Sequence, residues 1–160
     1  MKIYLASPLG FAPSTMAFLR ELKAELRGHG HVVFDPWEGD DPFEEHPGKT
    51  KDTSPEENAA GLASINHRIG EANRRAIEGA EALVAVLDGP DVDSGTASEV
   101  GFAFALGKLL VGYRGDTRLT GENAATLVNL QVQYWIEESA GGRGRLVRTL
   151  PDLTAALDEA

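Results

Sequence analysis

The chain contains no cysteine among its 160 residues. Disulfide bridges, zinc–thiolate sites and a cysteine nucleophile are therefore excluded. The four histidines show no close metal-ligand spacing, so we expect no metal site.

Long apolar runs and positive charge are also scarce. The N-terminal sequence MKIYLASPLG has one lysine and an apolar run too short for a signal peptide or a membrane span. We therefore expect a cytoplasmic protein that makes no membrane contact. Lysine and arginine number 15 against 25 acidic residues, which gives a net charge of −10. Such a surface repels a phosphate backbone and argues against a nucleic-acid partner, although a neutral small substrate is unaffected.

What the chain does have is the length and the hydrophobic content, 42%, of a globular protein. We expect residues 1–160 to form a single domain. Short apolar segments at 2–6, 31–34, 83–87 and 109–113 predict buried strands, and 145–150 predicts an edge strand. Helices are predicted between them and at the C-terminus, over 14–28, 61–80, 96–107, 125–138 and 151–159.

This alternation predicts an α/β fold. We expect a flavodoxin-like, doubly wound domain whose five-stranded, mainly parallel sheet has the order 2-1-3-4-5, with helices on both faces. Residues 35–60 do not follow the alternation, because they form a long acidic stretch without periodicity. That loop is either a lid, closing Trp37 or Phe43 on a ligand, or a solvated excursion.

In such a sheet, ligands bind where the strand order reverses, here between the first and third strands. The loops expected there are 7–14 and 88–96. The first contains Ser7 and Phe11, an aromatic residue that could cover a flat ring. Taken alone, however, the loop favours a phenylalanine packed back onto the core, and it lacks the glycine spacing of a phosphate-binding loop.

The second loop and the helix after it carry Asp88, Asp91, Asp93 and Glu99 within twelve residues. The segment from Thr96 to Glu99 matches the capping box of a helix start, in which the glutamate bonds back to the threonine amide. Spacing alone therefore favours a capping role for Glu99. In the first turn of its helix, Glu99 would also feel the positive end of the helix dipole, which favours the ionised form.

Several segments together are more specific than any one motif. They are KIYLASP, IGEANRRAIEGAEALVAVLDG, DSGTASEVGFAFALGK, GYRGDTR and VNLQVQYWI. With these segments the chain resembles the nucleoside 2-deoxyribosyltransferase family over nearly its whole length.

The resemblance implies a catalytic set. Glu99 matches the family's nucleophilic glutamate in the pattern D-x-G-T-A-x-E-x-G, which also contains Gly95. Asp93 matches the aspartate that contacts the nucleobase and assists its departure. Tyr4 matches a tyrosine that orients the nucleophile.

Substrate contacts are implied as well. Asn129 matches an asparagine that a neighbouring subunit lends to the sugar 5'-hydroxyl, so a homo-oligomer is expected. Gln131 stands where many members have methionine, and Asn73 stands where members carry either aspartate or asparagine near the base. Ser7, Phe11, Asp88 and Gly95 complete the expected substrate-binding set.

The implied reaction exchanges the nucleobase of a 2'-deoxynucleoside for a free nucleobase, with retention, through a deoxyribosyl–Glu99 intermediate and with no cofactor. Two alternatives stay open. One is a hydrolase of the same superfamily, acting on a 2'-deoxynucleoside or its 5'-monophosphate, for which Arg114 and Arg118 would have to reach a phosphate rather than pair with Asp116. The other is a non-catalytic, flavodoxin-like nucleotide-binding module.

Overall fold

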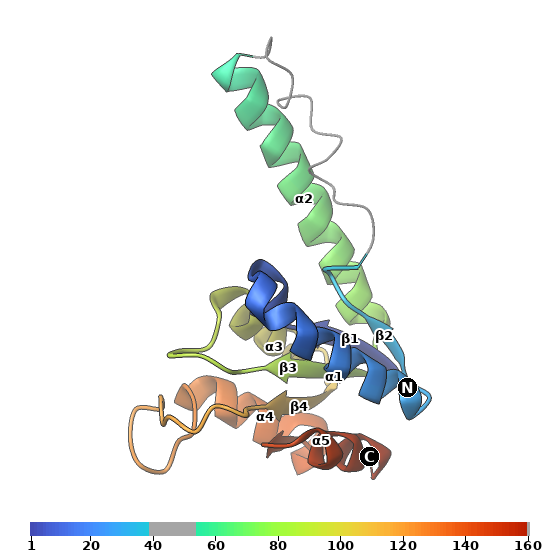
Figure 1. Cartoon of the computed structure of the whole chain (residues 1–160), viewed down its shortest axis with the longest axis vertical. Helices are drawn as coiled ribbons and strands as arrows, with labels where there is room; N and C mark the ends of the chain where they lie inside the picture. The colour runs from blue at the N-terminus through green and yellow to red at the C-terminus, as the bar shows by residue number, and fades with distance from the viewer. Residues whose placement is uncertain (39–53, 160) are drawn as a thin grey trace.

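The computed structural model describes residues 1–38 and 54–159, and its centre is a parallel sheet (Figure 1). The strands have the order β2-β1-β3-β4-β5 and are all parallel. This confirms the predicted α/β fold and strand order. The strands are β1 (Lys2–Ala6), β2 (Val32–Phe34), β3 (Ala82–Val86), β4 (Leu109–Tyr113) and β5 (Arg145–Val147).

Helices connect the strands and cover both faces of the sheet. Two short 3-10 helices, η1 (Pro8–Phe11) and η2 (Pro13–Thr15), lead from β1 into the first long helix. The α-helices are α1 (Met16–Gly28), α2 (Pro55–Gly79), α3 (Ser94–Ala105), α4 (Leu130–Gly142) and α5 (Leu150–Asp158).

The alternation of side chains along each strand divides the core into two layers. In β1, Ile3 and Leu5 join the layer beneath α1 and α5. Tyr4 and Ala6 point to the other face, into the layer formed with α2, α3 and α4. The strand therefore directs the Tyr4 side chain toward α3.

The carboxyl ends of β1 and β3 mark the point where the strand order reverses. Tyr4 in β1 is in register with Phe34 of β2 on one side and with Leu83 of β3 on the other. The loop that follows β1 and the loop that leads from β3 to α3 therefore leave the sheet at the same end, where ligands bind in doubly wound folds.

Each of the five helices begins at a different residue from the one predicted; α1 begins at Met16 rather than at 14, and α5 at Leu150 rather than at 151. Helix α2 begins at Pro55, so residues 55–60 belong to a helix rather than to the expected 35–60 loop, and the helix extends well beyond the sheet (Figure 1). Helix α3 begins at Ser94, two residues early, and α4 begins at Leu130, five residues late. Phe43 lies outside the described residues.

Candidate active site

Tyr4 and Glu99 form the centre of the candidate site. The Tyr4 hydroxyl donates a hydrogen bond of 2.5 Å to Oε1 of Glu99, joining β1 to α3. Tyr4 is fully buried, and its ring stacks on that of Phe34, with centroids 5.6 Å apart. The orientation of the Glu99 carboxylate is thus fixed by a side chain that itself has little freedom to move.

Burial shifts the ionisation of both groups. Burial of Glu99 raises its pKa above the usual glutamate value, the hydrogen bond from Tyr4 opposes that shift, and the charge of nearby Asp93 adds to it. The pKa of Tyr4 is raised well above its usual value, first by burial and then by the hydrogen bond to Glu99. Tyr4 therefore remains a hydrogen-bond donor at any physiological pH.

Asp93, rather than the segment from Thr96 to Glu99, caps helix α3. Its Oδ2 accepts hydrogen bonds from the Thr96 amide, at 2.9 Å, and from the Thr96 hydroxyl, at 3.2 Å. The capping-box interpretation of Glu99 is therefore wrong, because the helix begins at Ser94 and the glutamate bonds to Tyr4 instead. Glu99 is also beyond the first turn, so the helix dipole contributes little to its ionisation.

The loop after β1 presents an aromatic pair. Phe11 is 73% exposed, so the expectation that it packs back onto the core is wrong. Its ring meets the edge of Trp37, with centroids 4.4 Å apart and an angle of 78° between the rings. Ser7 is buried; its hydroxyl accepts from the Leu9 amide and its carbonyl accepts from the Trp37 indole.

A hollow of about 400 Å³ opens at the carboxyl ends of β3 and β4. Asp88 contributes to its lining and accepts a hydrogen bond of 2.8 Å from the Asp116 amide. The other lining residues are Phe18, Tyr113, Gly115 and Asp116.

The two arginines considered for a phosphate have structural partners instead. Arg114 is buried, and its guanidinium donates to the backbone carbonyls of Leu87, Gly89 and Arg118. Arg118 pairs with Asp116, as the salt-bridge interpretation expected. Arg114 thus holds the loops after β3 and β4 together, a role that its sequence position did not reveal.

The remaining predicted residues lie on three helices. Asn129 caps α4: its Oδ1 accepts from the amides of Gln131 and Val132, and its Nδ2 donates to Glu122 at 2.8 Å. Gln131 is exposed in the first turn of the same helix. Asn73 is half-buried on α2, and Gly95 is exposed at the start of α3.

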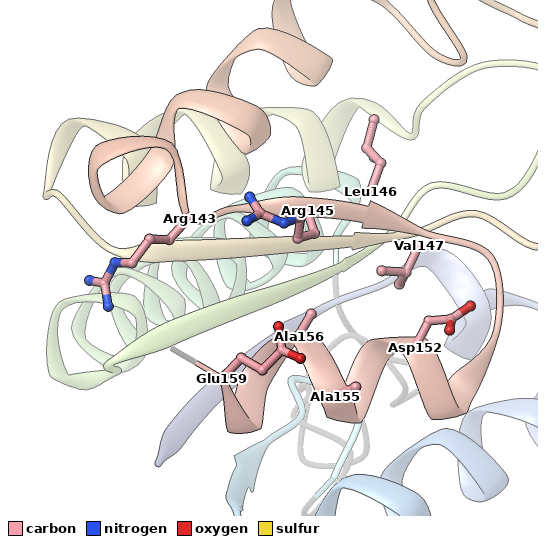
Figure 2. A pocket seen from close by; sticks show the side chains of 8 residues that line it. All are labelled: Arg143, Arg145, Leu146, Val147, Asp152, Ala155, Ala156 and Glu159. Carbon is pink, nitrogen blue, oxygen red and sulfur yellow. The ribbon is translucent and has the colours of Figure 1, made fainter.

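A second hollow, of about 270 Å³, lies at the far edge of the sheet, between β5 and α5 (Figure 2). Arg145 on β5 forms part of one wall, and Asp152 and Glu159 project from α5 on the other (Figure 2). This hollow shares no lining residue with the Tyr4–Glu99 site.

Within residues 1–38 and 54–159, no group of three histidines or carboxylates is arranged to hold a metal ion. Among the helices in this part of the chain, none has both the length and the apolar composition needed to cross a membrane.

Comparison with known proteins identifies the family. The nucleoside 2-deoxyribosyltransferase family profile matches residues 3–131, a span that contains Tyr4, all of α3 and the segments between them. The chain belongs to this family. A Schizosaccharomyces pombe relative, an uncharacterised protein, is 30% identical over 124 residues; the match covers 75% of this chain and 53% of the relative. The chain thus spans about half the length of that curated relative.

Solved structures share the family fold. A conserved protein from Enterococcus faecalis V583 is 25% identical, with a TM-score of 0.69 and coverage of 99% of this chain and 98% of that chain. A 2-deoxyribosyltransferase from Bacillus psychrosaccharolyticus is 22% identical, with a TM-score of 0.62 and coverage of 96% and 90%. A CMP N-glycosidase from Clostridium botulinum is 14% identical, with a TM-score of 0.57 and coverage of 99% of each chain. At these identities the last two show a shared fold.

Proposed function

We propose that this protein is a nucleoside 2-deoxyribosyltransferase that exchanges the nucleobase of a 2'-deoxynucleoside, with Glu99 as the nucleophile. The observation that carries the proposal is the Tyr4–Glu99 pair, with its 2.5 Å hydrogen bond. The pair joins β1 to α3 below the carboxyl ends of the strands, the end of the sheet at which ligands bind in doubly wound folds. Membership of the family supports the substrate class.

The pair suits a carboxylate nucleophile. Tyr4 donates to Oε1, which orients the carboxylate and leaves Oε2 for attack on C1' of the sugar. As the C1'–N bond breaks, its electron pair leaves with the nucleobase, and the transition state resembles an oxocarbenium ion. The nitrogen of a second nucleobase then attacks C1' and releases the Glu99 carboxylate. Two inversions give net retention.

The leaving base needs a proton, which solvent supplies, and Asp93 is proposed to contact the base and help it accept that proton. The acceptor base returns its own N–H proton to solvent as it bonds to C1'. Asp93 lies close enough to Glu99 for its charge to raise the pKa of that carboxyl. Asp88, Asn73 and Gly95 are proposed to contact the substrate, together with Ser7 and Phe11 in the loop after β1.

The sugar 5'-hydroxyl is assigned to Asn129 and Gln131 of a neighbouring subunit in a homo-oligomer. Both are neutral amides suited to a hydroxyl. Asn129 Nδ2, which donates to Glu122 within its own chain, would exchange that partner for the substrate.

The guanidinium of Arg114 is buried and donates to three backbone carbonyls, which argues against a 5'-monophosphate substrate. Attack of water on the same intermediate would give hydrolysis, so transfer and hydrolysis share every step up to the deoxyribosyl–enzyme.

The covalent step can be tested by acid quench and mass spectrometry of protein mixed with deoxyinosine or thymidine in the absence of acceptor base. We expect a mass increase of one deoxyribosyl group, located on the peptide that contains Glu99, and none for Glu99→Gln. Turnover without any adduct, or an adduct on another residue, would contradict the assignment of the nucleophile.

A further inference from the structure

Trp37 is held in place at the carboxyl end of the sheet by three contacts. Its indole Nε1 donates to the Ser7 carbonyl at 2.9 Å, and its backbone amide donates to Oδ1 of Asp35 at 3.0 Å. The indole also lies so close to Gly10 that a Cβ there would fall 2.1 Å from the ring. Gly10 is therefore needed for the indole to occupy this position.

The residues on either side of Trp37 are anchored to α1. The Lys23 ammonium lies 2.7 Å from Asp35 and 2.9 Å from Glu38, and the Asp35 side chain is fully buried. Burial alone would lower the pKa of Lys23, but its bonds to the two carboxylates outweigh that effect and raise it. Lys23 therefore stays charged, and the backbone on both sides of Trp37 is fixed before any ligand arrives.

Despite these contacts, Trp37 remains 40% exposed, and the adjoining Phe11 is 73% exposed. The angle of 78° between their rings makes two nearly perpendicular apolar walls, which we call the aromatic corner. A planar ring stacked on one wall would meet the other at its edge. Base–aromatic stacking is a common source of nucleobase affinity.

The aromatic corner lies beyond the carboxyl ends of β1 and β2, the two strands that carry the stacked Tyr4 and Phe34. Trp37 bonds to Ser7, which follows β1 only three residues after Tyr4. Phe34, at the end of β2, stacks on Tyr4 itself. The same two strand ends thus position both the nucleophile pair and the aromatic corner.

We infer that Trp37 is the base-stacking residue of this site and favours purine over pyrimidine 2'-deoxynucleosides. The inference rests on the proposed function for the substrate class. The preference follows because a purine presents a larger flat surface to the indole. Phe11, nearly perpendicular to the indole, limits how far a stacked base can slide across the face of Trp37. Gly10 and the Lys23–Asp35 pair hold the indole in position before the base binds.

Intrinsic fluorescence tests the contact directly, because the chain has two tryptophans. Trp135→Phe leaves Trp37 as the fluorophore, and Trp37→Phe leaves Trp135 as the matched control; both carry Glu99→Gln so that substrate is not consumed. Titration with deoxyinosine should quench Trp37 emission saturably and leave Trp135 emission unchanged. Nucleoside binding detected by calorimetry without any quenching of Trp37 would overturn the inference.

Kinetics of the full chain provide a second test. Trp37→Leu should lower kcat/KM for deoxyinosine by about 5- to 150-fold, mainly through KM, as expected for the loss of a stacked base. The loss should be smaller with thymidine. Gly10→Ala, which displaces the indole but keeps it, should show the same pattern. Equal losses with both nucleosides, or no loss, would contradict the proposed preference.

The two proposals fail separately. If deoxyinosine quenches Trp37 emission but the wild-type protein shows no turnover, the stacking contact is supported and the transferase is refuted. Turnover with normal kinetics in Trp37→Leu would support the transferase and refute the stacking contact.

Discussion

At Glu99, the burial that folding imposes opposes the ionisation that catalysis requires. Its burial disfavours the charged form, and the hydrogen bond from Tyr4 restores part of the loss. A carboxylate that is oriented but poorly solvated is a better nucleophile than one surrounded by water. We therefore expect loss of the Tyr4 hydrogen bond to lower activity, and removal of the Glu99 charge to raise stability.

Tyr4→Phe should move the acidic limb of the kcat/KM profile to higher pH. The Tyr4 hydrogen bond lowers the pKa of Glu99, so its loss raises that pKa further and leaves less of the nucleophilic form at neutral pH. The profile is measured against Tyr134→Phe, which alters an exposed tyrosine of α4 and should leave the limb in place. An unshifted limb in Tyr4→Phe would show that another group controls it.

Glu99→Gln should unfold at a higher temperature than the wild type at neutral pH. Because the pKa of Glu99 is raised in the folded state, its contribution to stability is complete below the unfolded pKa and is lost as pH rises through the folded pKa. The glutamine carbonyl still accepts from Tyr4 and carries no charge. Each kcal/mol gained raises Tm by about 2–4 °C for a chain of this size.

Thermal scans of both proteins at neutral pH and near pH 4 test this. The two curves should converge at low pH, where Glu99 is protonated. A Glu99→Gln protein that is less stable at both pH values would contradict the account.

The Tyr4–Glu99 contact could not be found from spacing, because 95 residues separate the partners. The resemblance to the family supplied that pair. Local spacing instead favoured a capping role for Glu99, and the actual cap, Asp93, lies three residues before Thr96. Phe11 was misjudged for a related reason: its partner, Trp37, comes from a loop after another strand.

At the scale of elements, α1 and the end of β2 are joined by a buried ion pair. Lys23 on α1 has a side chain only 9% exposed, and the Asp35 carboxylate is fully buried. Such a pair contributes little net stability when intact but is costly to break, because one charge is left buried.

Lys23→Ala should accordingly lower the free energy of unfolding by about 3 kcal/mol, because it leaves the fully buried Asp35 carboxylate without its ion-pair partner. Asp35→Ala would be milder, because Lys23 would still pair with Glu38 at 2.9 Å. Arg75→Ala is the matched control, because Arg75 is 72% exposed in its pair with Glu71 and should contribute less than about 0.5 kcal/mol. Urea denaturation of Lys23→Ala and Arg75→Ala measures the difference. Equal effects would show that the Lys23–Asp35 pair is not the anchor proposed here.

The central strands were predictable because they are short apolar runs, and β3 and β4 are buried along their whole length. The edge strand β5 begins with an exposed arginine and ends at Val147 rather than at 150. Helix starts were harder to predict. The first residues of α2 are polar and carry no periodicity, so the helix was expected to begin at 61 rather than at Pro55. The apolar spacing places the start of α4 at 125, whereas Asn129 caps the helix and Leu130 begins it.

At the scale of the whole molecule, the site proposed here needs more than one chain. Glu99 and Asn129 lie on different helices, and Asn129 is assigned to the neighbouring subunit's substrate. Leu130, which follows Asn129 at the start of α4, is an exposed apolar side chain that a second copy would cover.

Mixing inactive variants tests this sharing of residues. Glu99→Ala and Asn129→Ala should each have little activity alone. After the subunits are exchanged, hybrid oligomers should recover part of it, because some sites then receive an intact Glu99 from one chain and an intact Asn129 from the other. If mass spectrometry shows that the subunits have exchanged but activity does not return, Glu99 and Asn129 belong to the site of the same chain.

Glu99 is proposed to transfer a deoxyribosyl group from one base to another. Chromatography of the purified protein with deoxyinosine or thymidine, with and without free adenine or cytosine, tests it most directly. We expect a new deoxynucleoside when acceptor base is present and none with Glu99→Ala. Free base released at the same rate with or without acceptor would indicate a hydrolase, and an active Glu99→Ala protein would contradict the account.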